Sequence, residues 1–100
     1  MNLKKIKKNK FFFVYILYNY TREVSYVGYT NDIQKRLQAH NSGKGAKFTK
    51  GGFWDLIFFK KFKSKILAMQ FEYKLKKNKK LRKYLVLKNK TIKFKQIFDY

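Results

Sequence analysis

The acidic residues of this chain are few, and they limit the metal chemistry that it can support. There are five: Glu23, Asp32, Asp55, Glu72 and Asp99. A two-metal site needs several carboxylates to hold both ions. Only Glu72 falls inside an expected helix, whereas the others fall in a hairpin, at element starts or at the terminus. The chain has no cysteine and one histidine, so thiolate zinc sites and histidine clusters are excluded. A single-metal site on Glu72 is therefore the feasible option.

Glu72 has two interpretations on a helical wheel. It lies on the flank of the apolar stripe of Leu67, Phe71 and Leu75, which predicts a position at the edge of a groove. The alternative is a surface ion pair with Lys76, four residues later, which contributes only a few tenths of a kcal/mol. Position alone favours the ion pair.

Arg36 and His40 are four residues apart in another expected helix, so they share one face near the apolar positions Ile33 and Leu37. A guanidinium and an imidazole that lean toward a sheet could hold a phosphate and assist proton transfer. The alternative is a half-exposed histidine beside an arginine whose stem lies along apolar surface.

Tyr15 and Tyr26 fall on two strands that are expected to pair, which would bring two hydroxyl groups together beside a metal-bound water. The chain contains 8 Tyr and 11 Phe, so packing or stacking roles are the alternative for both residues.

Basic residues outnumber acidic ones by 26 to 5, which gives a formal charge of +21. AT-rich coding explains part of the lysine excess, but the resulting field still attracts phosphates, and nucleic acid is the first partner to consider. The expected contacts are exposed lysines around the candidate site: Lys35, Lys44, Lys47, Lys50, Lys74, Lys76 and Lys77. The longest apolar run covers about eight residues, too short for a membrane span of roughly 20. A cytoplasmic location is compatible with these features.

Three strands and three helices must position these side chains. Aromatic and β-branched runs predict strands at 12–18 and 24–30, joined by a hairpin, and a third at 54–62. A helix is expected at 32–41, with a weak capping signal from Asn31, and a flexible, glycine-rich basic loop follows it. Ser64 is expected to cap a second helix that ends near the 76–80 lysine run, and a short third helix is expected at 81–87. Residues 91–98 are left unassigned.

This order predicts an α+β domain, with a three-stranded antiparallel sheet flanked by helices. We divide the chain into a basic N-terminal arm (1–10), a central folded domain (11–88) and a C-terminal extension (89–100).

The ordered set of candidate residues resembles the GIY-YIG endonuclease family. It resembles the small single-domain bacterial members, the junction-cutting branch and the N-terminal nuclease domain of the excinuclease C subunit. The similarity covers roughly residues 12–77 and includes five elements in register: Phe13-Val14-Tyr15, Tyr26-Val27-Gly28, Arg36, His40 and Glu72. The departure is Phe13, where the first motif has glycine, which puts substrate fit in question more than catalysis.

The resemblance implies that Tyr15, Tyr26, Arg36, His40 and Glu72 converge on one concave face. It also implies that Glu72 anchors one divalent metal, usually Mg²⁺ or Mn²⁺, that Arg36 steadies the scissile phosphate and that a tyrosine activates water. We favour Tyr26 as the base, with Tyr15 orienting or sharing the proton and His40 as an alternative.

The expected activity is metal-dependent hydrolysis of DNA, branched or single-stranded, linked to repair or recombination, with RNA kept as a second substrate. A non-catalytic basic nucleic-acid-binding module is the main alternative. Asp55 with Glu72-Tyr73-Lys74 faintly resembles a different nuclease site that requires a strand, but this segment has helical periodicity. A partner protein could supply targeting, and the sequence leaves the oligomeric state open.

Overall fold

Three strands form one antiparallel sheet in the computed structural model, which describes residues 11–98, with 90–98 described by backbone alone. β1 (Phe12–Asn19) is central, between β2 (Val24–Thr30) and β3 (Asp55–Phe62). β1 and β2 form a hairpin in which Tyr15 is opposite Gly28, and β3 pairs with β1 across a register shift at Ile16/Leu17. The α+β class and the antiparallel sheet predicted from the sequence are confirmed.

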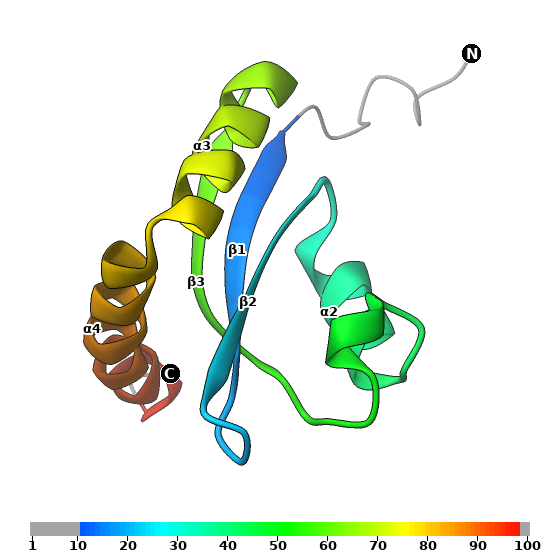
Figure 1. The fold of residues 1–100 in the computed structure, drawn as a ribbon, viewed down its shortest axis with the longest axis vertical. Helices are drawn as coiled ribbons and strands as arrows, with labels where there is room; N and C mark the ends of the chain where they lie inside the picture. The colour runs from blue at the N-terminus through cyan, green and yellow to red at the C-terminus, as the bar shows by residue number, and fades with distance from the viewer. Residues whose placement is uncertain (1–10, 99–100) are drawn as a thin grey trace.

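Helices cover both faces of the sheet, as Figure 1 shows. α2 (Ile33–Asn41) lies on one side, and α3 (Lys65–Lys77) and α4 (Lys79–Phe98) lie on the other. Side chains alternate along β1, so Val14 and Ile16 pack with Ala68 and Leu75 of α3. Tyr15 and Leu17 point the other way and pack with Trp54 on the α2 side.

Side-chain caps set the starts of the helices. The Ser64 hydroxyl accepts a hydrogen bond from the Leu67 backbone at 3.2 Å, as expected. The cap of α2 is Asp32, whose carboxylate accepts from the Lys35 backbone at 3.1 Å. The weak signal assigned to Asn31 was therefore wrong by one residue, because the carboxylate of Asp32 is the acceptor that reaches the third backbone N–H.

α4 is longer than the sequence patterns indicated. A short helix at 81–87 was expected and 91–98 was unassigned, but one helix runs from Lys79 to Phe98. No proline or glycine interrupts this segment, and Leu81, Leu85 and Val86 pack on the core. The boundary expected at 88 therefore falls within a continuous helix. The expected arm at 1–10 lies outside the described residues.

The basic loop after α2 is anchored rather than loose. It contains a short 3-10 helix, η1 (Lys47–Thr49), and Thr49 is fully buried. The Asn41 side chain accepts from the Trp54 backbone N–H at 2.7 Å and donates to its carbonyl at 3.0 Å. These contacts tie together the two ends of the segment that was expected to be flexible. No helix within residues 11–98 is long and apolar enough to cross a membrane.

Candidate active site

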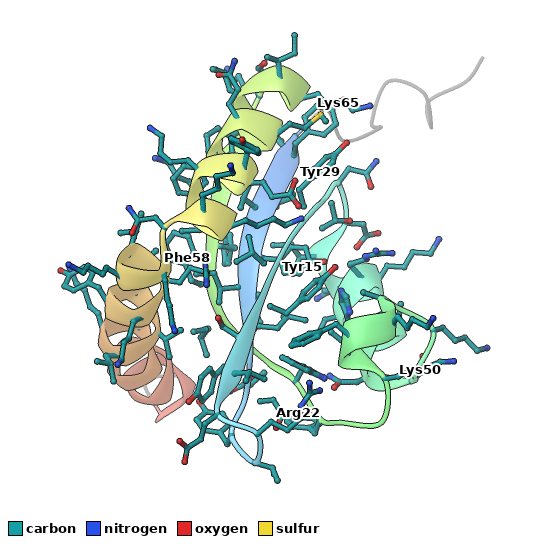
Figure 2. The ribbon with its side chains drawn as sticks, viewed as in Figure 1. Tyr15, Arg22, Tyr29, Lys50, Phe58 and Lys65 are labelled. Atoms are coloured by element: carbon teal, nitrogen blue, oxygen red, sulfur yellow. The ribbon has the colours of Figure 1, made fainter. Side chains whose placement is uncertain are left out.

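Tyr15 lies at the centre of the candidate site and is only 2% exposed. It points from β1 toward α2 (Figure 2), and its hydroxyl is 2.9 Å from Nε2 of His40. The phenol crosses β2 at Gly28, where a Cβ atom would overlap the Tyr15 hydroxyl. Glycine is thus required at position 28 because the phenol occupies the space of a side chain.

His40 is fully buried in the last turn of α2, and its hydrogen bonds fix its tautomer. Thr49 donates its hydroxyl proton to the Ala46 carbonyl at 2.8 Å, so its oxygen is left to accept from Nδ1 of His40, also at 2.8 Å. His40 therefore carries its proton on Nδ1 and offers the lone pair of Nε2 to the Tyr15 hydroxyl. Burial, assisted by the charge of Arg36, lowers the His40 pKa below 6.5, which keeps the ring neutral at pH 7.

Aromatic rings enclose this pair. The Tyr26 ring lies 5.0 Å from the His40 ring and 6.5 Å from the Tyr15 ring, centroid to centroid. Phe48 of η1 stacks on Tyr26 at 6.2 Å, and the Arg22 guanidinium covers Phe48 at 4.7 Å, centroid to centroid for the rings and Cζ to centroid for Arg22. Tyr26 therefore forms a wall of the site, while the hydrogen bond to His40 belongs to Tyr15.

Two charged groups act on the Tyr15 hydroxyl. Burial raises the pKa of Tyr15 to about 12, the Arg36 guanidinium opposes this shift, and the phenolate form of Tyr26 and the Glu72 carboxylate add to it. Arg36 is exposed, so it is accessible from solvent above the buried phenol. Both the guanidinium and the carboxylate are thus close enough to Tyr15 to influence its proton.

Glu72 approaches Tyr15 from a different direction than we expected. Its helix, α3, covers the opposite face of the sheet from the phenols, so the five residues do not share a single concave face. α3 packs against the edge strand β2, and a surface groove joins the two sides there: Phe12, Tyr29, Thr30, Asn31, Arg36 and Lys65 line it. The candidate site therefore wraps around the edge of β2, with Arg36 on one side and α3 on the other.

Glu72 also makes the surface ion pair that was its alternative interpretation. Its carboxylate is 3.2 Å from Nζ of Lys76, and its side chain is 18% exposed. Such a pair with an exposed lysine is weak and readily exchanged for another cation. Within the described residues, no group of three or more His, Cys, Asp or Glu side chains is placed so that it could hold a metal ion.

The expected nucleic-acid contacts are all exposed, in two groups. One group lies on α2 and the loop after it, and the other lies on the second half of α3: Lys35, Lys44, Lys47 and Lys50, then Lys74, Lys76 and Lys77.

Four residues of the site were missed in the sequence: Gly28, Gly45, Thr49 and Lys65. A Cβ atom at Gly45 would overlap Nδ1 of His40, so the two glycines make room for the Tyr15 and His40 rings. Gly28 lies in the quoted Tyr26-Val27-Gly28 motif, which could have indicated a close approach. No sequence signal distinguishes Thr49 or Lys65 from other threonines and lysines.

The profile of the GIY-YIG catalytic domain matches residues 11–85. This chain belongs to the GIY-YIG family. Two UPF0213 proteins are among its relatives. That of Oceanobacillus iheyensis is 52% identical over 52 residues, covering 51% of this chain and 60% of that protein. That of Clostridium perfringens is 42% identical over 82 residues, covering 81% of this chain and 87% of that protein.

A solved structure is also similar to this GIY-YIG protein. The solution NMR structure of the UPF0213 protein BH0048 from Bacillus halodurans is 38% identical, with a TM-score of 0.49, and the match covers 78% of this chain and 83% of that one. GIY-YIG domains form a nuclease superfamily, for which nucleic acid is the substrate class.

Proposed function

We propose that this GIY-YIG protein is a metal-dependent endonuclease that hydrolyses phosphodiester bonds in DNA, selectively in branched or single-stranded segments. Strand cutting of this kind serves DNA repair or recombination. One observation carries the proposal: the Tyr15 hydroxyl donates to a neutral, buried His40 while it lies within the electrostatic reach of Arg36 and Glu72. A module that only bound nucleic acid would have no use for a buried proton acceptor behind a phenol.

The chemistry of the available donor set fits a single Mg²⁺ or Mn²⁺ ion. Mg²⁺ usually keeps several waters and is held by one or two carboxylates together with substrate phosphates. Glu72 supplies one partly exposed carboxylate, which an exposed lysine now neutralises. A cation bound at Glu72 would supply positive charge against the negative charge that develops on the scissile phosphate.

The residues of the chain account for the proton transfer. Arg36 would hold the phosphate above the phenol. The Tyr15 oxygen would accept a proton from the attacking water as its own proton passes to Nε2 of His40. The resulting imidazolium keeps the hydrogen bond from its Nδ1–H to the Thr49 oxygen. It returns the proton that it gained when the product leaves. Alone, Tyr15 is a poor base at pH 7 because it releases its proton only near pH 12, so His40 is the final acceptor.

This scheme assigns the role of base to Tyr15 rather than to Tyr26, which we favoured from the sequence. The reason is that Tyr15 makes the hydrogen bond to His40 and Tyr26 packs on the ring. Tyr26 then shields the His40 ring from water.

A metal-dependent cleavage screen tests the proposal. Linear, flap, four-way and single-stranded DNA are incubated with Mg²⁺, Mn²⁺ or a chelator. We expect cutting only with metal, and we expect Glu72→Gln to abolish it while DNA binding stays within a few-fold of the parent. Glu23→Gln removes the same charge from the exposed β1–β2 turn and serves as the matched control. If Glu72→Gln cuts as fast as Glu23→Gln, Glu72 has no catalytic role. If the parent binds every DNA and cuts none, the protein is a non-catalytic binding module.

A further inference from the structure

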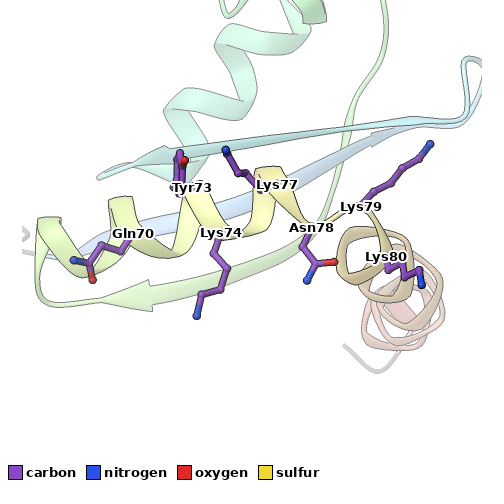
Figure 3. A pocket seen from close by; sticks show the side chains of 7 residues that line it. All are labelled: Gln70, Tyr73, Lys74, Lys77, Asn78, Lys79 and Lys80. Atoms are coloured by element: carbon purple, nitrogen blue, oxygen red, sulfur yellow. The ribbon is translucent and has the colours of Figure 1, made fainter.

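A second groove lies away from the relay, at the corner where α3 meets α4 (Figure 3). From α3 it is lined by Gln70, Tyr73, Lys74 and Lys77. The single residue between the helices, Asn78, and the first two residues of α4, Lys79 and Lys80, complete the lining. These residues lie on the solvent side of α3, since Ala68 and Leu75 face the core.

The groove combines positive charge with an exposed aromatic ring. Four of its lining residues are lysines and none is acidic. Tyr73 is 62% exposed, and Nζ of Lys77 lies 4.9 Å from the centre of its ring. An exposed phenol ring in a basic groove suits a ligand that has both a flat aromatic face and negative charge.

The two helices that form the groove are held at a fixed angle. The Asn78 side chain accepts from the Leu81 backbone at 2.9 Å and so caps α4. Arg82 donates to the Leu75 carbonyl at 3.0 Å and to the carbonyl of Lys76, which satisfies the last turn of α3. Tyr73 on α3 and Lys80 on α4 are therefore positioned relative to each other before any ligand binds.

We propose that this groove binds an unpaired segment of a nucleic-acid strand, with one base stacked on Tyr73 and the flanking phosphates on Lys74, Lys77 and Lys80. The proposal rests on the proposed function, which gives nucleic acid as the polymer that reaches this surface. It adds the feature that is recognised, which is a strand that is unpaired on one side of the cut.

Single-stranded nucleic acid fits the groove better than the other anionic partners. In a duplex the bases are stacked on one another, so a duplex could use the lysines but not the ring. An acidic protein segment could also pair with the lysines, but its carboxylates have no flat face to place on Tyr73.

The groove is next to the candidate active site along α3. Glu72 and Tyr73 are consecutive, so their side chains diverge by about 100° around the helix. A strand that passes Glu72 at the β2 edge could continue across α3 to Tyr73. The groove would then hold the unpaired part of a branched substrate while the relay acts on the adjoining phosphate.

Equilibrium binding to a dye-labelled twelve-nucleotide thymidine strand tests this inference, with the full chain, in EDTA so that no cutting occurs. We expect Tyr73→Ala to weaken binding by roughly tenfold, because the stacked base is lost, and Tyr73→Phe to bind as the parent does. The affinity of Tyr73→Ala for the matching duplex should differ from that of the parent by less than twofold. The double variant Lys74→Gln, Lys77→Gln should reduce the salt dependence of binding, whereas Tyr73→Ala should leave it unchanged.

Tyr84→Ala provides a closely matched control. Tyr84 on α4 is 55% exposed and has Nζ of Lys88 5.5 Å from its ring centre, but it does not line the groove. We expect this variant to bind the single strand as the parent does. If Tyr73→Ala and Tyr84→Ala bind it equally well, or if Tyr73→Ala weakens duplex binding as much, the proposal is overturned. Polyglutamate that binds with the same dependence on Tyr73 would also overturn it and indicate an acidic protein partner.

These measurements separate the groove from the nuclease proposal. A Tyr73-dependent affinity for single strands in a protein that cuts nothing would support the groove and count against the nuclease. Metal-dependent cutting with no effect of Tyr73→Ala on binding would support the nuclease and count against the groove.

Discussion

The hydroxyl of Tyr15 on β1 lies 2.9 Å from Nε2 of His40 on α2, and neither side chain is more than 2% exposed. Because the Thr49 oxygen accepts a hydrogen bond from Nδ1–H of His40, Nε2 carries no proton and the phenol must be the donor in this pair. This gives the proposed relay a direction, from the attacking water through Tyr15 to His40, and the predictions below follow from it.

Tyr15→Phe should lower the single-turnover cleavage rate by about 100-fold or more, the usual contribution of a positioned acid or base. The variant also leaves Nε2 of His40 without its donor, which costs about 1 kcal/mol of stability. Tyr26→Phe keeps the ring wall, so its rate should fall less than tenfold. If Tyr26→Phe is the slower of the two, the base is Tyr26 and the assignment reverses.

The pH dependence of cleavage should show the His40 pKa. His40 must be neutral to accept a proton, and its pKa lies below 6.5. The rate should therefore rise with pH at acidic values and level off before about pH 7. A Tyr15 phenolate acting alone would instead give a rate that keeps rising toward the Tyr15 pKa of about 12. A pH profile of single-turnover rates distinguishes these cases.

The stability of the fold should fall at high pH because of Tyr15. Its pKa is about 12 in the folded protein, whereas the ordinary pKa of a tyrosine is 10.0. The folded state thus retains the proton where the unfolded chain releases it, so this contribution is full below pH 10 and is lost as the pH rises toward 12. Denaturant titrations should show a decline over this range that is smaller in Tyr15→Phe. An equal decline in both proteins would contradict a raised Tyr15 pKa.

Gly28→Ala should disable the site. The added Cβ would overlap the Tyr15 hydroxyl, so the phenol must move away from His40. We expect a loss of about 1–3 kcal/mol of stability and a rate close to that of Tyr15→Phe. The partner experiment is Gly45→Ala, where the overlap is with the His40 ring. Thermal unfolding and cleavage assays check both variants, and normal cleavage by Gly28→Ala would show that the phenol position is not critical.

Arg36→Ala should reduce the cleavage rate by roughly 100-fold, because a fixed cation opposite the developing phosphate charge is lost. DNA affinity should change only slightly, since one phosphate contact is a small share of a chain with a net charge of +21. Rate and affinity are measured on the same DNA at one salt concentration. Equal losses in both would make Arg36 a binding residue only.

The sequence predicted the sheet well because its strands are short aromatic and β-branched runs that are bounded by polar or glycine-containing segments. It predicted α4 poorly, because lysines interrupt the apolar spacing after Leu87 and no breaker marks an end. Local spacing also placed Arg36 and His40 on one helix face and Tyr15 and Tyr26 on the two strands of one hairpin. All of these relationships lie within one element or one hairpin.

The relationships that the sequence could not give are those between distant segments. The burial of His40 depends on Thr49, nine residues later, and on a loop whose glycines suggested mobility. The position of Glu72 depends on which face α3 covers, and helical periodicity does not specify a face of the sheet. Lys65 is one of many lysines until the fold brings it to the same groove as Arg36.

Trp54 is the only tryptophan, it is fully buried, and its indole N–H donates to the Thr49 carbonyl at 3.0 Å. The same threonine holds His40 through its hydroxyl. The tryptophan fluorescence of the protein therefore comes from a single residue, whose indole is hydrogen-bonded to Thr49 next to His40. A red shift or quenching of that emission would show that Thr49 has separated from its partners, so the state of the loop can be followed without a dye.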